Sequence, residues 1–164
     1  MRESSTTNPD APEPLQQQVT VVTLGRLIKL FDSYEWHYEL DEEGYIKGLW
    51  NNYLHYFHLD EGTSNILHIT AFARESVDPA RRDELEAFID DWHRERHWPK
   101  LIYEDTADGD LLLRALFAHD FHAGATDAQL DLLVNCALTT IAYALDAAAE
   151  QFSTPDTVLP ERDY

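Results

Sequence analysis

The chain has 164 residues, the size of one domain, and carries 31 Asp and Glu against 12 Lys and Arg, a formal net charge of −19. This charge repels nucleic-acid phosphates and anionic lipid headgroups, so nucleic-acid binding is disfavoured and no membrane partner is expected. Apolar residues make up 44% of the chain, which is enough for one core, and the single Cys136 excludes an internal disulfide. Because neither a secretion signal nor an apolar run of membrane-spanning length stands out, we expect a cytoplasmic protein.

The two ends of the chain differ in composition from its middle. Residues 1–17 are mostly Ser, Thr, Pro, Gln and acids, with almost nothing to bury, which predicts a disordered leader. Residues 153–164 contain two prolines and several charges and are predicted to form a flexible tail. A single α+β domain is therefore expected over residues 18–152.

The first half of this domain has one helical pattern followed by short β-prone runs. Apolar residues recur at helical spacing from Val21 to Phe31, which predicts an amphipathic helix from Thr20 to about Ser33. The runs 35–40, 45–50, 53–59 and 66–74 are separated by turn-forming residues, which is typical of an antiparallel meander. Along 53–59 neither alternate set of residues is strongly polar, so both faces of that strand are candidates for cover.

The second half contains two helices and a hairpin. Asp78-Pro79 is a strong helix start, and Pro99 forces that helix to end near residue 96. Two strands, 100–105 and 111–118, follow around a turn that ends in Asp-Gly. Thr126 and Gln129 form a capping box that opens the longest helix, to about Phe152. The order α-β-β-β-β-α-β-β-α predicts an α+β fold, an antiparallel β-sheet packed by helices.

Three motifs carry a resemblance to a known family. They are Asp-Glu-Glu-Gly at 41–44 followed by Trp50, the Trp98-Pro99-Lys100 step after a helix, and GATDAQL at 124–130. In this order and at these separations, the chain resembles the YbjN-domain family of bacterial sensory transduction regulators. The resemblance implies a fold like that of type III secretion chaperones, small modules that commonly act as dimers and bind other proteins. It brings no catalytic residue and no cofactor, so we expect a protein that is not an enzyme.

One segment, DDWHRERHWPK at 90–100, has the residue types of a reactive site. Asp90, His93 and His97 lie at spacings that place them on one side of a helix, where they are candidate metal ligands. The alternative is structural: the Arg, His and Lys side chains here surround a helix C-terminus, whose dipole favours cations. Five of the twelve bases lie at 81–100, which leaves a local nucleic-acid surface as a third hypothesis.

The leading hypothesis is a regulator or chaperone-like adaptor, a homodimer that binds a protein or peptide partner. Large aromatic side chains supply contact area at such surfaces, and the candidates are Trp50, Tyr53, Phe57, Trp92 and Trp98. The alternative for each of them is a place in the core. The second functional hypothesis is a metal- or small-molecule-responsive sensor that uses Asp90, His93 and His97.

Overall fold

The computed structural model describes residues 18–62 and 64–153. The predicted leader, 1–17, and all of the predicted tail except Ser153 lie outside the described residues. The elements in chain order are α1 (Leu24–Ser33), β1 (Tyr38–Leu40), β2 (Ile46–Trp50), β3 (Tyr53–Leu59), β4 (Ile66–Phe72), the 3-10 turn η1 (Pro79–Arg81), α2 (Arg82–Glu95), β5 (Lys100–Asp105), β6 (Leu111–Asp120) and α3 (Asp127–Phe152). The predicted α+β fold and its element order are confirmed.

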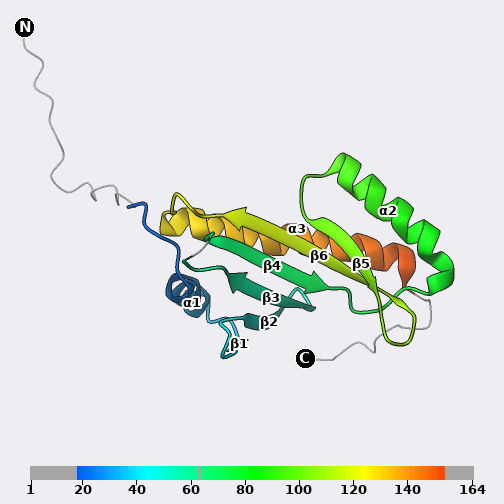
Figure 1. Ribbon diagram of the computed structural model, residues 1–164, viewed down its shortest axis with the longest axis horizontal. Helices are drawn as coiled ribbons and strands as arrows, with labels where there is room; N and C mark the ends of the chain where they lie inside the picture. Colours follow the sequence, from blue (N-terminus) through cyan, green and yellow to red (C-terminus); the bar gives the residue numbers. More distant parts are fainter. Residues whose placement is uncertain (1–17, 63, 154–164) are drawn as a thin grey trace, which may run out of the picture.

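The six strands form one antiparallel sheet in the order β1-β2-β3-β4-β6-β5 (Figure 1). Consecutive strands pair from β1 to β4. The chain then passes through α2 and returns at the far edge as β5, before β6 inserts between β5 and β4. A short segment, residues 121–126, then leads from the end of β6 to the start of α3.

The three α-helices of the described residues all cover the same face of the sheet. Alternate residues of each strand point to this inner face, and β3 shows the pattern clearly, with Tyr53, His55, Phe57 and Leu59 buried. The residues between them are only partly buried and belong to the outer face. Of the two faces of β3 that the sequence made candidates for cover, the described helices therefore cover one.

Helix α1 begins later than predicted. Thr23 is its N-cap, and the Thr23 hydroxyl accepts a hydrogen bond from the backbone N–H of Arg26. Residues before the cap are extended, so Val21 is 67% exposed and does not belong to the apolar face of the helix. The prediction from Thr20 was wrong here because apolar spacing continued past the capping residue. Within the helix, the ring of Phe31 lies 5.0 Å from that of Phe57 on β3.

Helix α3 is the main core helix, and it lies behind β4 and β6 in Figure 1. The capping box at its start is present, with Thr126 and Gln129 each accepting the other's backbone N–H at 3.1 and 2.9 Å. By length and composition α3 is apolar enough to span a membrane, contrary to the expectation that no run stands out. Its buried residues, which include Val134, Ile141 and Leu145, pack in the core of the domain.

Candidate partner-binding groove

An apolar groove lies between the first half of α3 and the end of β6. Trp98 closes one side, the segment after β6 closes one end, and α3 forms the opposite wall. We call it the α3–β6 groove; its volume is about 380 Å³, and its lining residues are Trp98, Phe117, His119, Phe121, Gly124, Ala125, Gln129, Leu132, Leu133 and Cys136. Phe117 and Phe121 are buried, while Trp98 is 49% exposed and Leu132 is 72% exposed. The groove thus has exposed apolar side chains at its rim and buried aromatic rings at its base.

The lining of the groove is free of formal charge apart from its histidine. Among the described residues that line it, none is Asp, Glu, Lys or Arg, although 26% of the chain is charged. Apolar surface is poorly solvated by water. Covering the groove with another apolar surface is therefore favourable by about 25 cal/mol per Å² of apolar surface buried. Apolar, partly open surfaces of this kind are typical of interaction sites.

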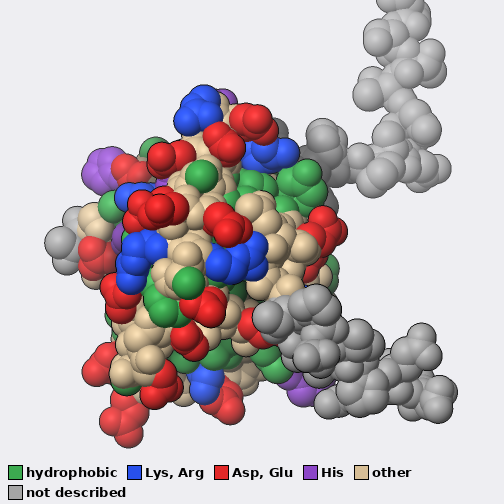
Figure 2. Space-filling view, turned by 90° about the vertical axis from the view of Figure 1, so that its right-hand side faces the viewer, with side chains coloured by type: hydrophobic (Ala, Val, Ile, Leu, Met, Phe, Trp, Pro, Cys, Tyr) green, Lys and Arg blue, Asp and Glu red, His purple; other side chains and the backbone are tan. Residues whose placement is uncertain are grey.

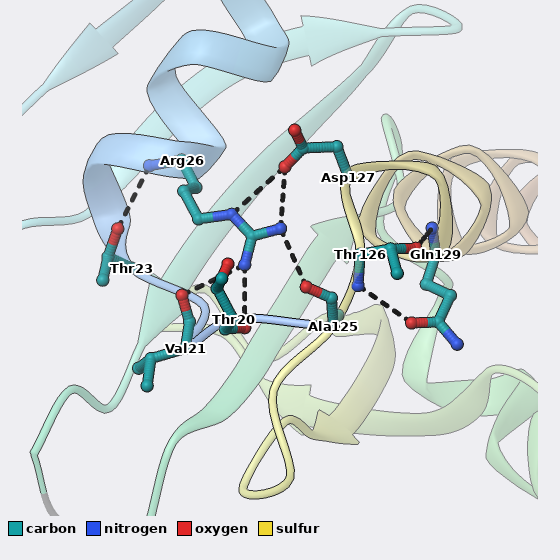
Figure 3. Close-up of polar contacts among 8 residues, drawn as sticks. All are labelled: Thr20, Val21, Thr23, Arg26, Ala125, Thr126, Asp127 and Gln129. Carbon is teal, nitrogen blue, oxygen red and sulfur yellow. Dashed lines mark hydrogen bonds and ion pairs between the residues drawn. The ribbon is translucent and has the colours of Figure 1, made fainter. Parts of the chain in front are cut away.

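A guanidinium holds the closed end of the groove in place. The side chain of Arg26 donates hydrogen bonds to the carbonyl oxygens of Thr20 at 2.9 Å, Val21 at 3.0 Å and Ala125 at 3.0 Å (Figure 3). It also contacts the Asp127 carboxylate at 2.7 Å. Arg26 therefore joins three segments, namely the chain before α1, α1 itself and the β6–α3 loop, and Figure 3 shows all of them converging on its side chain.

The same end of the groove requires a glycine. Gly124 has φ of +78°, in the left-handed region that favours glycine, and a Cβ there would lie 2.6 Å from the carbonyl oxygen of Thr20. Thr20 and Ala125 form an isolated antiparallel bridge with backbone bonds of 3.2 and 2.9 Å. Gly124 thus allows the loop and the chain before α1 to approach closely.

The predicted aromatic binding surface is largely wrong. Trp50, Tyr53, Phe57 and Trp92 are all buried, at 8%, 1%, 1% and 5% exposure, and they belong to the hydrophobic core. Only Trp98 is exposed, and its ring stacks at an angle on Phe117, 5.2 Å between centroids. The type of residue did not separate core from surface, because large aromatic side chains suit both. The sequence analysis did not identify the other residues of the groove. For Leu132 a signal was present, because this apolar residue lies outside the buried stripe of α3.

The predicted grouping of Asp90, His93 and His97 on one helix face is not formed. Helix α2 ends at Glu95, so His97 lies beyond it, before the cis peptide bond between Trp98 and Pro99. The Nε2 atom of His93 accepts a hydrogen bond from the backbone N–H of Leu101 at 2.9 Å, which ties α2 to β5. Within residues 18–62 and 64–153, no group of three or more His, Cys, Asp or Glu is placed to hold a metal ion.

Acids pair with the arginines of the basic cluster at 81–100. Its four arginines, Arg81, Arg82, Arg94 and Arg96, form ion pairs with Glu84, Asp105, Asp91 and Glu95. Figure 2 views the end of the molecule that lies at the right of Figure 1, and there Asp and Glu side chains lie among and around the Lys and Arg. A mixed-charge surface of this kind offers no basic track for a phosphate backbone.

A second cavity, of about 420 Å³, lies near the end of α3, and Tyr53, Arg74 and Phe152 are among its lining residues. The hydroxyl of Tyr53 donates to the Asp146 carboxylate at 2.5 Å, and burial together with this bond raises the pKa of Tyr53 to about 12. Ser153, the last described residue, also lines this cavity. This cavity has charged residues in its wall, unlike the α3–β6 groove.

Comparisons with known proteins agree on the fold. The family model that matches is YbjN, described as "Putative bacterial sensory transduction regulator", over residues 23–150. The crystal structure of YbjN from E. coli, "a putative transcription regulator", has a TM-score of 0.66 at 19% identity and covers 82% of this chain and 97% of that chain. No curated protein matches the chain.

Two further solved structures share the architecture. A chain of the HopA1–SchA chaperone–effector complex has a TM-score of 0.54 at 14% identity, covering 79% of this chain and 98% of that chain. An uncharacterized protein from Methanothermobacter thermautotrophicus has a TM-score of 0.53 at 12% identity, with the same coverage. These identities show a shared fold alone, and at that level the predicted likeness to secretion chaperones is confirmed.

Proposed function

Since this chain belongs to the YbjN family of bacterial regulators, we propose that it is a non-enzymatic interaction protein that binds a protein or peptide partner in the α3–β6 groove. The observation that carries the proposal is the uncharged lining of the groove in a chain of net charge −19. A partner that covers Trp98 and Leu132 removes both from water, and a buried aromatic residue with its neighbours commonly contributes most of the affinity of an interface.

The fold supports this proposal without deciding the partner. One of the similar solved structures is a chaperone–effector complex, in which this architecture occurs in a protein that is bound to another. Fold likeness alone does not transfer a function, so the argument depends on the groove of this chain. The cytoplasmic location and the homodimer expected from the sequence remain predictions, and light scattering in solution tests the dimer.

A peptide selection with a matched pair of variants tests the groove. The full chain is immobilised and used to select binders from a library of random dodecapeptides, and the affinity of the best peptide is measured by fluorescence anisotropy. Leu132→Asp introduces a charge at the rim of the groove, whereas Leu49→Asp introduces the same charge on the outer face of β2. The two leucines are equally exposed, at 72% and 70%.

We expect Leu132→Asp to weaken binding at least tenfold, about 1.4 kcal/mol, because the carboxylate would have to be desolvated against an apolar partner. Leu49→Asp should leave the affinity within twofold. Failure to select any peptide, or equal losses for the two variants, would contradict the groove as the binding site.

A further inference from the structure

Strand β6 continues past the end of its neighbour β5. The pairing of β5 with β6 runs from Asp105 opposite Leu111 to Lys100 opposite Leu116. On its other side β6 stays paired with β4 up to Asp120, which lies opposite Ile66. In the described part of the chain, residues 117–120 of β6 therefore have a strand on one side only, and Figure 1 shows β6 extending beyond the start of β5.

The register decides which backbone groups face this open edge. Ala73 donates to the carbonyl of Leu113, and Phe121 donates to the carbonyl of Asn65, so the odd-numbered residues of β6 bond toward β4. In an antiparallel sheet the next residues bond toward the opposite side. The N–H and C=O groups of Ala118 and Asp120 thus point to where β5 would continue. Among the described residues, no strand lies there to pair with them.

The open edge runs along the α3–β6 groove. Phe117 and His119, whose side chains point to the inner face, are both lining residues of the groove. The chain before β5 does not fill the gap as a strand, because the ring of Trp98 lies over Phe117 instead. A backbone edge and an apolar groove therefore lie side by side over about four residues, or roughly 13 Å of strand.

From this juxtaposition we propose that the partner binds as an extended segment that adds a strand to β6 at residues 117–120, in line with β5. The inference rests on the proposed function and names its binding mode. Residues of the partner opposite Ala118 and Asp120 would exchange backbone hydrogen bonds with them, as in other cases of strand addition. Residues at the alternate positions would point to the inner face, toward the groove.

This register specifies the chemistry of the segment. The positions beside Phe117 and His119 face an uncharged apolar groove, so they take apolar side chains. The position opposite Asp120 lies on the outer face next to a carboxylate, where a cross-strand Lys or Arg is favourable. The partner is therefore an extended peptide with apolar and basic residues in alternation, which also complements the net charge of −19.

The outer edges of the sheet are less suited to strand addition. Strand β1 has only three residues and is followed by three acids at 41–43. The outer strand β5 carries Lys100, Glu104 and Asp105, and charges on an edge oppose pairing with another chain. The segment 117–120 has a single charged side chain, that of Asp120, which accepts a hydrogen bond from the N–H of His122.

The test uses a heptapeptide of alternating valine and lysine, blocked at both ends, with valine at both termini. Two methylated forms keep its charge: one is N-methylated at the lysine amides and the other at the internal valine amides. With valines facing the groove, the lysine amides are those that point to β6. We expect methylation of the lysine amides to weaken binding at least tenfold, and methylation of the valine amides to change it by less than threefold.

A variant pair of the protein tests the same bonds from the other side. Ala118→Pro removes the outward N–H, whereas Ala118→Val keeps it, and both changes lie on the exposed outer face. We expect a loss of at least tenfold for the proline variant only, and the amide resonances of Ala118 and Asp120 should shift on titration of the isotope-labelled full chain. Circular dichroism and thermal melting check that both variants fold.

The outcomes separate this inference from the proposed function. Equal binding of the two methylated peptides, or no binding of the unmodified peptide, overturns strand addition. In that case, whether the groove is the binding site is decided separately, by the effect of Leu132→Asp on the affinity of the library-selected peptide. If the free chain is a dimer that Ala118→Pro dissociates, the edge is occupied by a second copy, and the proposed peptide mode is also overturned.

Discussion

Replacing Arg26 by methionine tests whether one side chain holds the closed end of the α3–β6 groove. Methionine keeps much of the aliphatic length of the side chain but removes every donor. The change leaves three backbone carbonyls, those of Thr20, Val21 and Ala125, without the guanidinium. It also leaves Asp127 without its ion-pair partner.

The magnitude follows from the exposure of the groups. A hydrogen bond from a charged donor contributes about 1.5–3 kcal/mol when it is well buried. Here the bonds to Thr20 and Val21 are exposed enough for water to replace part of each, and the bond to Ala125 is partly buried. We therefore assign about 1 kcal/mol to each bond and expect a loss of about 2–4 kcal/mol in the free energy of unfolding. The Asp127 carboxylate is 84% exposed, so its ion pair adds no more than about 1 kcal/mol.

Urea unfolding followed by tryptophan fluorescence measures this loss, and Asp127→Ala is the matched control. We expect the midpoint of Arg26→Met to fall with an unchanged slope, and Asp127→Ala to lie within about 1 kcal/mol of the parent chain. For a chain of this size each kcal/mol corresponds to roughly 2–4 °C in melting temperature. If Arg26→Met is as stable as the parent chain, or if Asp127→Ala loses as much stability as Arg26→Met, the hydrogen bonds of Arg26 to the three carbonyls do not hold this end of the groove.

Three further predictions concern single positions. Burial lowers the pKa of His55, whose ring is fully buried, so its contribution to stability is present above about pH 6.5 and is lost as the pH falls below that value. In urea unfolding, His55→Leu should therefore lose less free energy of unfolding between pH 7 and pH 5 than the parent chain. An identical change of the free energy of unfolding with pH in both proteins would contradict this. Gly124→Ala should destabilise the chain by about 1–3 kcal/mol more than Gly62→Ala, because both positions have positive φ but only Gly124 has a backbone atom within 3 Å of a new Cβ. Equal melting temperatures for the two alanine variants would refute this difference. His93→Ala should cost about 1 kcal/mol through its lost bond to a β5 amide, while His97→Ala should cost almost nothing, and a stability gain on adding zinc to the parent chain that both variants lose would instead indicate a metal site.

The elements were predictable because their signals are local. The capping box of Thr126 and Gln129, the start at Asp78-Pro79 and the Asp-Gly turn each act within a few residues, and the structure has elements at all three. The strands were predicted from β-prone runs between turn-forming residues, a signal that also acts within a few residues. The start of α1 was predicted wrongly, because the apolar spacing continues back to Val21 whereas the helix begins after its N-cap, Thr23.

The candidate site was less predictable, because exposure is a property of the packed chain. Trp92 and Trp98 stand six residues apart in one charged segment, yet one is 5% exposed and the other 49%. The indole N–H of Trp92 donates to the carbonyl of Pro99 inside the core, whereas Trp98 closes the groove. The helical spacing of Leu85, Ile89 and Trp92 indicates the buried face of α2, but no local signal places Trp98 at the side of a groove.

Local patterns and composition were enough to predict the number, type and order of the α-helices and strands, the family and the strongly acidic character of the chain. Three features come instead from long-range packing of the described residues: the helices share one face of the sheet, the end of β6 has a strand on one side only, and an uncharged groove lies beside it. The difference follows from sequence separation, because caps, turns and periodicity depend on residues that are only a few positions apart in the chain. The groove is lined by Trp98, Phe117 and Leu132, which lie far apart in the chain, and their proximity depends on the crossover through α2 and on the register of β5 against β6.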